Sequence, residues 1–317
     1  MTPLALGGLV AAFLVTAMLG GPFIRWLRRK QLGEQIREVG LEHHEGKRGT
    51  PTMGGLLMIG VTLAIALLLE WRRPEVWPLA IALAGFGLLG ALDDLSKVAN
   101  RAGYGFQVRY KFLSHPGLAL ALALLLYFRL AEHTIDAGPI RNLDLSWGYI
   151  PFALVTIFSA SSASLIDGLD GLAGGVYALC LVAYLVIALH NGQQTLAVFT
   201  AVAVGALLGF LWFNVNPAQV FMGDTGALAF GGLIGVVALM SHQPLLLPLI
   251  GLMLVIELLS VMLQVSYFKL THGKRLFRMS PFHHHLELIG WPEVKIVQRF
   301  WLATAATASV GVGLALL

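Results

Sequence analysis

Acidic residues gather beside a lysine in a spacing that suits phosphate or metal chemistry. Asp93 and Asp94 precede Lys97 by four and three residues, so on a helix either carboxylate can pair with the ammonium. Neighbouring residues on a helix point about 100° apart. One acid would therefore face a substrate while the other faces a partner or a metal. An ion-paired, solvated helix end has the same spacing, and it stays the alternative.

A second acidic motif carries glycines. Asp167 and Asp170 are three residues apart, and Gly168 and Gly171 follow them at a junction between two apolar stretches. If the motif is helical, the acids share a face; if it is a turn, the glycines permit positive φ and close approach of a ligand. The motif suits Mg²⁺ or sugar hydroxyls, and an ordinary Asp-Gly turn is the alternative.

Asp224 stands where a loop meets an apolar stretch. The loop contains Asn214 and Phe221, and Gly223 and Gly226 flank the acid. Asp224 is either the N-cap of the next helix or a metal ligand, because helix starts favour phosphate and Mg²⁺ binds carboxylates together with substrate phosphates. Phe221 suits either stacking on a base or packing in the core.

Two further motifs are basic or rich in histidine. Lys47 and Arg48 either anchor a helix at the headgroups or neutralise a diphosphate. Ser280 as N-cap, followed by Pro281, predicts a short helix that carries three consecutive histidines, His283, His284 and His285. Consecutive helical residues fan out, so the three cannot ligate one zinc ion. Hydrogen bonding to a polar or anionic substrate is predicted, with a solvated loop as the alternative.

The elements that must position these motifs are membrane helices. The 317 residues are 57% hydrophobic and 12% charged, whereas soluble domains carry about 25% charged residues. This composition excludes a soluble globular protein, and stretches that are apolar on every side exclude an outer-membrane barrel. The single cysteine, Cys180, excludes an intrachain disulfide. The net charge of +4 is read as a signal of membrane orientation and predicts no nucleic-acid partner.

The apolar stretches predict an all-α integral membrane protein with a single polytopic domain over residues 1–317. About ten transmembrane helices are expected, at 2–26, 51–69, 76–92, 114–130, 149–165, 171–189, 194–213, 225–241, 244–270 and 297–317. Of the 21 Lys and Arg residues, 17 then lie on or beside the loops of one face. That face is predicted to be cytoplasmic, with both termini on the extracytoplasmic side and all the motifs at the cytoplasmic face. Glu257 is the only acid well inside a predicted span, which leaves an ion-coupled transporter as a weaker alternative.

In this order the motifs resemble those of the phospho-MurNAc-pentapeptide transferases, the MraY family, within the polyprenyl-phosphate N-acetylhexosamine-1-phosphate transferase superfamily. The resemblance covers essentially the whole chain, and the three histidines between Ser280 and Trp291 indicate this branch. It implies a multi-pass protein of the bacterial inner membrane, Mg²⁺ as cofactor and commonly a homodimer. The implied reaction transfers phospho-MurNAc-pentapeptide from UDP-MurNAc-pentapeptide to undecaprenyl phosphate, giving lipid I and UMP in peptidoglycan synthesis. A sister transferase that uses UDP-GlcNAc is the alternative enzyme.

The same resemblance assigns roles to residues. It makes one of Asp93 and Asp94 the base for the lipid phosphate, Lys97 a phosphate partner and Asp224 the magnesium ligand. The substrate-binding positions that it implies are Lys47, Asp167, Asp170, Asn214, Phe221, His283, His284 and His285. One departure stands out, because Ser161 and Ser164 replace two asparagines of the family motif, and serine lacks the reach and second donor of an amide. This departure puts the hydrogen bonding of Asp167 in question.

Overall fold

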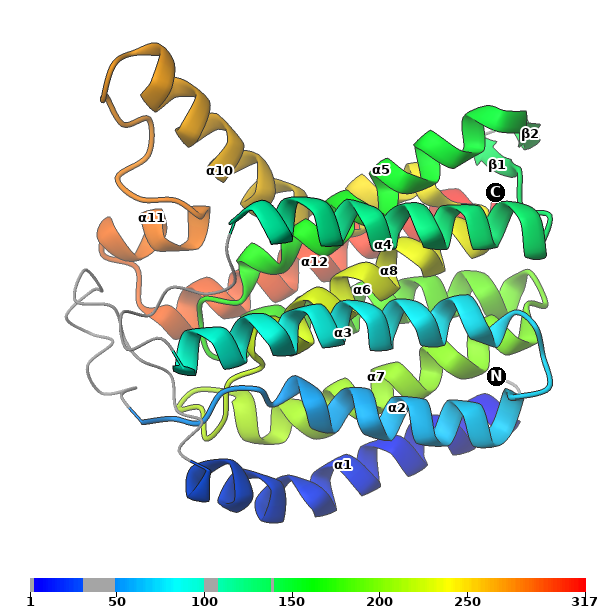
Figure 1. Ribbon diagram of the computed structural model, residues 1–317, viewed down its shortest axis with the longest axis horizontal. Coiled ribbons are helices and arrows are strands. Elements are labelled where there is room, and N and C mark those ends of the chain that lie inside the picture. The colour runs from blue at the N-terminus through cyan, green and yellow to red at the C-terminus, as the bar shows by residue number, and fades with distance from the viewer. Residues whose placement is uncertain (1–2, 31–48, 100–107, 138–139) are drawn as a thin grey trace.

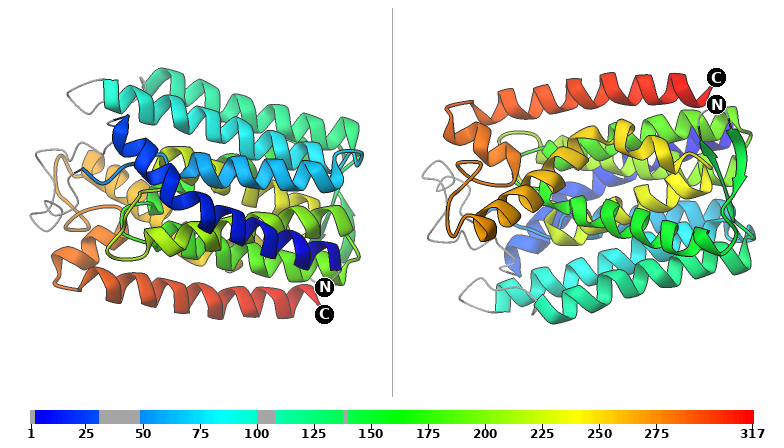
Figure 2. Two further views of the ribbon diagram at one scale, coloured as in Figure 1. Left: turned by 90° about the horizontal axis from the view of Figure 1, so that it is seen from below. Right: turned by 90° about the horizontal axis from the view of Figure 1, so that it is seen from above.

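The computed structural model describes residues 3–30, 49–99, 108–137 and 140–317. Long helices run roughly side by side through the molecule, and both termini lie at the same end (Figures 1 and 2). The helices are α1 (Pro3–Arg29), α2 (Gly55–Glu70), α3 (Val76–Ala99), α4 (Val108–Arg129), α5 (Tyr149–Ser162), α6 (Leu172–His190), α7 (Gln194–Asn214), α8 (Gly223–Met240), α9 (Leu247–Ile250), α10 (Leu252–Leu270), α11 (Phe282–Leu288) and α12 (Glu293–Ala315).

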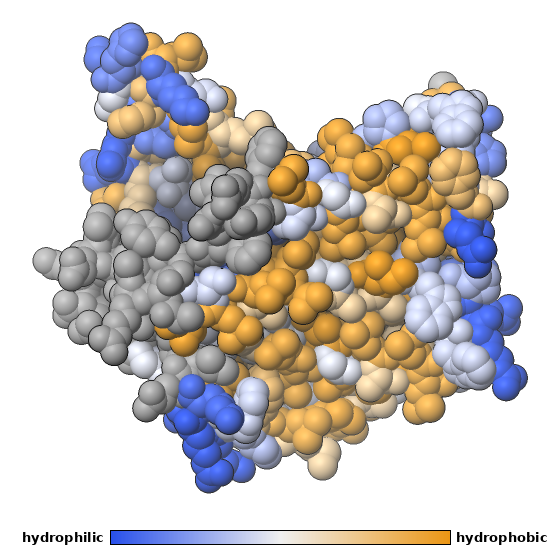
Figure 3. Space-filling view, viewed as in Figure 1, coloured by the Kyte–Doolittle hydropathy of each residue, from blue (hydrophilic) through white to orange (hydrophobic). Residues whose placement is uncertain are grey.

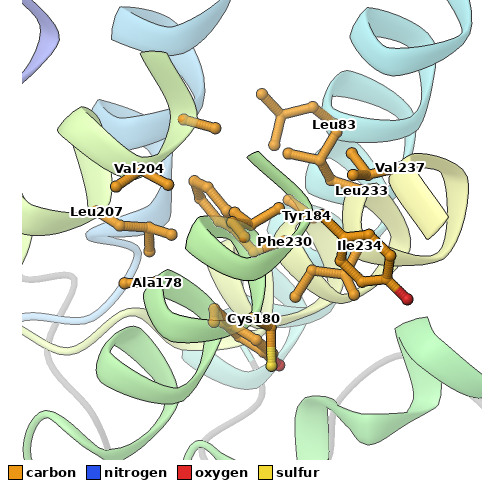
Figure 4. Close-up of a cluster of buried hydrophobic side chains, with 14 of the residues drawn as sticks. Leu83, Ala178, Cys180, Tyr184, Val204, Leu207, Phe230, Leu233, Ile234 and Val237 are labelled. Atoms are coloured by element: carbon orange, nitrogen blue, oxygen red, sulfur yellow. The ribbon is translucent and has the colours of Figure 1, made fainter. Parts of the chain in front are cut away.

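The centre of the bundle is formed by α6, α7 and α8. These helices are apolar around their whole circumference, and nearly every residue of α8 is buried. A helix that is hydrophobic on all sides is stable only where neighbours or lipid surround it. Figure 4 shows the resulting cluster, in which Leu83 of α3 and Tyr184 of α6 lie beside Phe230 of α8. This core fixes the starts of α6 and α8, where the acidic motifs lie.

The surface agrees with a bilayer environment. Figure 3 shows a broad apolar band across the middle of the face in view, with hydrophilic side chains at its two ends. Large hydrophobic side chains are exposed on several helices, among them Met18 of α1, Leu68 of α2 and Leu302 of α12. In the part of the chain that the structure describes, seven helices are long and apolar enough to cross a membrane. The chain is therefore a mostly helical, multi-pass membrane protein.

The expected spans differ from these helices in two places. The stretch 51–69 is helical only from Gly55, because residues 50–54 are irregular, with Met53 at a φ of +69°, and α2 has 16 residues. The stretch 244–270 is broken into a 3-10 turn (Pro244–Leu246), α9 and α10. The break falls at Gly251, whose φ of −100° and ψ of 36° are not helical, and Pro248 stands in the first turn of α9, where a proline is tolerated. Beyond this break α10 leans away from the bundle (Figure 1).

The sequence analysis did not predict the one small sheet among the described residues. Strands β1 (Thr134–Ala137) and β2 (Ile140–Asp144) pair antiparallel, with Thr134 opposite Asp144 and Ile135 opposite Leu143. The hairpin lies at the end of the molecule that holds the two termini (Figure 1). The acidic motifs and α11 lie at the opposite end, so the hairpin is separate from the candidate site.

Candidate active site

Three carboxylates surround one ammonium where α3 ends and α8 begins. The Lys97 Nζ atom lies 2.8 Å from Asp224 Oδ2, 3.0 Å from Asp93 Oδ2 and 3.8 Å from Asp94 Oδ1. The predicted pairing of Lys97 with both acids of its own helix is confirmed. Asp93 and Asp94 are buried, whereas the side chain of Asp224 is 30% exposed. Among the residues that the structure describes, three carboxylates thus meet one ammonium, and the carboxylate of Asp224 is the accessible one.

Asp94 has a second task, because its carboxylate receives the first N–H groups of α8. Oδ1 accepts a hydrogen bond from Asp224 N at 3.1 Å, and Oδ2 accepts from Thr225 N at 2.9 Å and Thr225 Oγ1 at 2.7 Å. The N-terminus of a helix carries partial positive charge that a carboxylate stabilises. The alternative in which Asp224 caps α8 is thus wrong: Asp94 supplies the cap from α3, and Asp224 lies in the first turn of α8 and contacts Lys97.

Glycines allow the backbones around this cluster to meet. A Cβ on Gly90 of α3 would collide with the backbone of Asp224, and a Cβ on Gly55 of α2 would collide with that of Gly226. Gly223 has φ of +72°, and a Cβ there would lie 2.6 Å from Asp94 Oδ2. Close approach of this kind is typical of small residues at interfaces between membrane helices. It brings carboxylates from α3 and α8 within reach of one lysine.

The irregular segment before α2 pairs with the backbone that leads into Asp224. Phe221 N donates to Pro51 O at 2.8 Å, and Gly54 N donates to Phe221 O at 2.8 Å. Gly55 N continues the pattern by donating to Met222 O at 3.0 Å. Irregular backbone is tolerated within a membrane protein where it is paired and buried in protein. Phe221, which is half-buried, is held here by its backbone.

The residues present fit a divalent cation. Carboxylate oxygens are the ligands that Mg²⁺ prefers, and it commonly takes one or two of them together with substrate phosphates. Among the described residues, no three acidic, histidine or cysteine side chains converge on one point as a preformed cage. Lys97 lies among the acids, and Asp224 is the accessible one. Asp224, with Asp93 beside it, would hold such an ion, whose charge is opposite to that of the carboxylates.

The Asp167–Gly171 motif is a turn between a 3-10 helix (Ala163–Ile166) and α6. Gly171 has φ of +79°, so the glycine is required there. Asp170 Oδ2 accepts hydrogen bonds from Asn216 Nδ2 at 3.1 Å and Ala218 N at 3.0 Å. Asp170 therefore ties this turn to the loop that leads into Asp224. Its predicted place in a nucleotide pocket stays a prediction.

Asn214, at the end of α7, connects the same two segments. Its Oδ1 accepts from Gly171 N at 3.2 Å, and its Nδ2 donates to Val220 O at 2.9 Å. Glu293, the first residue of α12, accepts from Asp170 N at 2.8 Å. The turn is thus fixed from α7 and α12 at once. Asn214 is buried and holds the backbone around the site.

The three histidines fan out on α11 as expected. His283 is fully buried, and a Cβ on Gly168 would collide with its Nε2. His284 is half-buried and its Nδ1 pairs with Glu287 Oε2 at 2.7 Å. His285 Nδ1 accepts from Arg278 N at 3.2 Å, and its ring stacks on Phe282. The expectation that Ser280 caps α11 is wrong, because Pro281 occupies the cap position and Glu257 of α10 receives the first N–H groups.

Several residues that hold the site were not found from the sequence. Thr225 and Glu293 each bond an acid from another element, and Gln264 of α10 accepts from Leu276 N and Phe277 N. Glu293 carried a usable signal, because an acid directly after Pro292 indicates a helix start. Glu257 was singled out as an isolated acid, without a role. Lys47 lies outside the described residues.

Comparison with known proteins defines the class first. A model described as glycosyl transferase family 4 matches residues 76–242, which is more than half of the chain and includes α3 through α8. The chain is therefore a membrane transferase of this class. A second model, phospho-N-acetylmuramoyl-pentapeptide-transferase signature 1, matches residues 47–59, the segment that pairs with Phe221.

Relatives narrow the class to one family. The phospho-N-acetylmuramoyl-pentapeptide-transferase of Oceanobacillus iheyensis is 43% identical over 316 residues, covering 96% of this chain and 95% of the relative. The protein of the same name from Listeria welshimeri is 44% identical over 92% of this chain and 91% of its own length, and that from Desulfotalea psychrophila is 41% identical over 95% and 89%. The chain belongs to the phospho-N-acetylmuramoyl-pentapeptide-transferase family.

Proposed function

We propose that this protein transfers phospho-MurNAc-pentapeptide from UDP-MurNAc-pentapeptide to undecaprenyl phosphate, giving lipid I and UMP. An oxygen of the lipid phosphate attacks the phosphorus that bears the sugar, a new phosphoanhydride forms, and the old one breaks to release UMP. The observation that carries the proposal is the cluster of Asp93, Asp94 and Asp224 around Lys97. Phe221 and Met222, which lead into Asp224, are paired through their backbone with the segment that matches the family signature.

The contacts of each residue indicate its role in the reaction. Asp94 is occupied by three donors from α8, so its part is to hold Asp224 in place. Since α8 holds Asp94, the base role for the lipid phosphate goes to Asp93, whose Oδ2 lies 3.0 Å from Lys97 Nζ. Lys97, freed from the acids, would pair with the diphosphate. Mg²⁺ at Asp224, when bound, would screen the charge that develops on the phosphates.

The finer features of the proposal concern the membrane. We propose ten crossings, of which seven meet the length and hydropathy expected of a span, with α2, α4 and α12 as the others. Both termini would lie outside the cell and the site at the cytoplasmic face, since Arg28, Arg29 and Lys97 flank it. The location is the bacterial inner membrane and the assembly a homodimer. Cysteine labelling of single-cysteine variants tests the orientation, and native mass spectrometry tests the dimer.

The decisive experiment uses purified protein in detergent with Mg²⁺, undecaprenyl phosphate and UDP-MurNAc-pentapeptide. We expect UMP release together with radiolabelled lipid I, and no turnover of UDP-GlcNAc. Turnover of UDP-GlcNAc alone would assign the chain to the sister transferases. Uptake by reconstituted vesicles without UMP release would favour an ion-coupled transporter, for which Glu257 offers little, since α11 occupies its carboxylate.

A further inference from the structure

Glu257 is a fully buried carboxylate in the middle of an apolar helix, and it holds the start of another helix. Its Oε2 accepts from Phe282 N at 3.0 Å and its Oε1 from His283 N at 3.2 Å. The Nδ1 atom of His283 lies 3.0 Å from Oε2. No side chain of α11 itself caps that helix. One carboxylate of α10 therefore meets both the backbone and the first imidazole of the histidine motif.

This contact sets the tautomer of His283. The two backbone partners of Glu257 are N–H groups and can only donate, so the carboxylate acts as an acceptor. An imidazole whose Nδ1–H donates to a carboxylate keeps its lone pair on Nε2 when it is neutral. Among the described residues, Nε2 of His283 has no hydrogen-bond partner, although it is buried. It is directed at Gly168, where only a glycine fits beneath the ring.

A second polar residue of α10 supports the same loop. Gln264 Oε1 accepts from Leu276 N at 3.1 Å and from Phe277 N at 2.8 Å. Gln264 is two helical turns beyond Glu257, so both lie on one face of α10, and both are buried. Their partners precede and begin α11. This polar face holds the histidine segment at two points, while the other faces of α10 are apolar.

We propose that Glu257 is a positioning residue for substrate binding. By fixing α11 and the ring of His283 against Gly168, it sets the place of His284 relative to Asp167 and Asp170, whose turn the ring contacts. His283 then acts as a spacer between α11 and that turn, and His284 is the imidazole that meets the sugar or peptide part of the substrate. This inference rests on the proposed function, because it concerns the affinity for that donor.

The test compares Glu257→Gln with the parent. Glutamine keeps the size but places an amide N–H against N–H donors, so α11 loses part of its anchor. Removing an outer partner that orients a histidine typically costs about 10- to 100-fold. We expect the KM for UDP-MurNAc-pentapeptide to rise by about that factor, while inhibition by UMP stays unchanged because UMP lacks the sugar and peptide. A residue that merely stabilises the fold would lower the yield of active protein and leave KM unaltered.

Two further variants keep the test sharp. Glu70→Gln is the matched control: Glu70 is also a buried carboxylate in an apolar helix, and it lies at the far end of α2. Its partners are Thr195 Oγ1 at 3.1 Å and Arg73 Nε at 4.0 Å. We expect its KM to equal that of the parent. His283→Asn keeps a donor for Glu257 but removes the ring above Gly168. It should raise KM as Glu257→Gln does, and the double variant should be no worse than either single one.

The outcomes separate the inference from the function. If the parent releases UMP and Glu257→Gln leaves KM unchanged, or the double variant is additive, the positioning role is wrong. An equal loss of UMP affinity would also overturn it. If Glu257→Gln gives no folded protein, His283→Asn alone decides by its KM. No turnover of the muramyl substrate by the parent would remove the proposed function, and the inference with it.

Discussion

The two ends of the bundle both contain buried acids, but they balance the charge differently. At the hairpin end, Asp136 accepts from Arg141 Nη1 at 3.1 Å, Gln243 Nε2 at 2.9 Å and Asn142 N at 2.8 Å. One carboxylate there meets one cation and two neutral donors. At the other end, Asp93, Asp94 and Asp224 all lie within 3.8 Å of the ammonium of Lys97. The acid at the hairpin end joins neighbouring elements, whereas several acids gathered around one lysine are an arrangement typical of functional sites.

The largest effect is expected for Asp224→Asn. Asparagine keeps the size, and Asp94 would still cap α8, but the charge that holds a cation is lost. We expect transfer to fall by more than about 100-fold, with the folded protein retained in size-exclusion chromatography. The measurement is turnover across a Mg²⁺ titration. Turnover like that of the parent at limiting Mg²⁺ would remove Asp224 from the metal site.

Substitutions of Asp93 and Asp94 should have different effects, because Asp93 is the proposed base and Asp94 caps α8. Asp93→Asn should slow transfer severely with little change in UDP-sugar binding, and rising pH should restore part of the rate. The second pKa of a phosphate is near 6, so the need for a base declines above neutrality. Steady-state rates from pH 6 to 9 measure this. If nucleotide binding falls as much as turnover, the base role of Asp93 is wrong.

Asp94→Asn should behave differently because its carboxylate caps α8. We expect it to lower both the rate and the thermal midpoint, with a stability cost of about 0.5–2 kcal/mol, typical of a lost helix cap. High pH should not rescue it, since the phosphate is not its partner. Rescue equal to that of Asp93→Asn would show that the two acids share one role.

The histidine motif gives a smaller, substrate-specific effect. Alanine at His284 or His285 should weaken turnover of UDP-MurNAc-pentapeptide by about 10- to 150-fold, the value of one hydrogen bond to a charged group. His284 should give the larger change, because it adjoins His283, whose ring contacts the turn of Asp167 and Asp170, although Glu287 holds its Nδ1 as Arg278 N holds that of His285. The kcat/KM of each variant measures this. Values like the parent's for both would leave the histidines outside the sugar and peptide site.

A substitution at the hairpin end should affect stability and leave activity unchanged. Asp136→Asn should leave kcat/KM within about twofold while lowering stability by roughly 1–3 kcal/mol, because a buried charged hydrogen-bond network is broken. Thermal unfolding and turnover on the same preparation separate the two effects. A loss of turnover without a loss of stability would mean that the hairpin end takes part in the reaction.

The smallest effect is expected for Ser164→Asn, which restores a family residue. Ser164 is half-buried in the 3-10 helix before Asp167, and its backbone O accepts from Asp167 N. We expect turnover equal to or above that of the parent. Ser161 is a poorer place for the same change, because it is fully buried with its backbone against Gly231. An inactive Ser164→Asn would show that this turn has repacked around serine.

Local spacing predicted the parts of the site that lie within one element. Asp93 and Lys97 pair because four residues make one helical turn, and Gly171 marks a turn because it follows Asp170. Contacts between elements could not be predicted. Nothing near Asp94 in the sequence indicates that it caps α8, about 130 residues away, and nothing near Glu257 indicates α11. Both follow from packing of the whole bundle.

The sequence did not predict the break within 244–270, and the reason is related. Apolar composition continues through Pro248 and Gly251, so hydropathy alone describes one long span. The hairpin was missed because β1 and β2 are short and follow a polar junction. The sequence predicted the membrane class and the convergence of motifs correctly, because charge and hydropathy decide those without knowledge of contacts.

Gly55, Gly90 and Gly226 have a consequence for how this sequence can vary. They contribute no charge and no donor side chain, yet a methyl group on any of them would meet backbone or side-chain atoms of the neighbouring chain segment. In a scan of all single substitutions, we expect these positions to tolerate as few replacements as Asp224 itself. Residues that take no chemical part in the reaction would then be as essential to function as those that do.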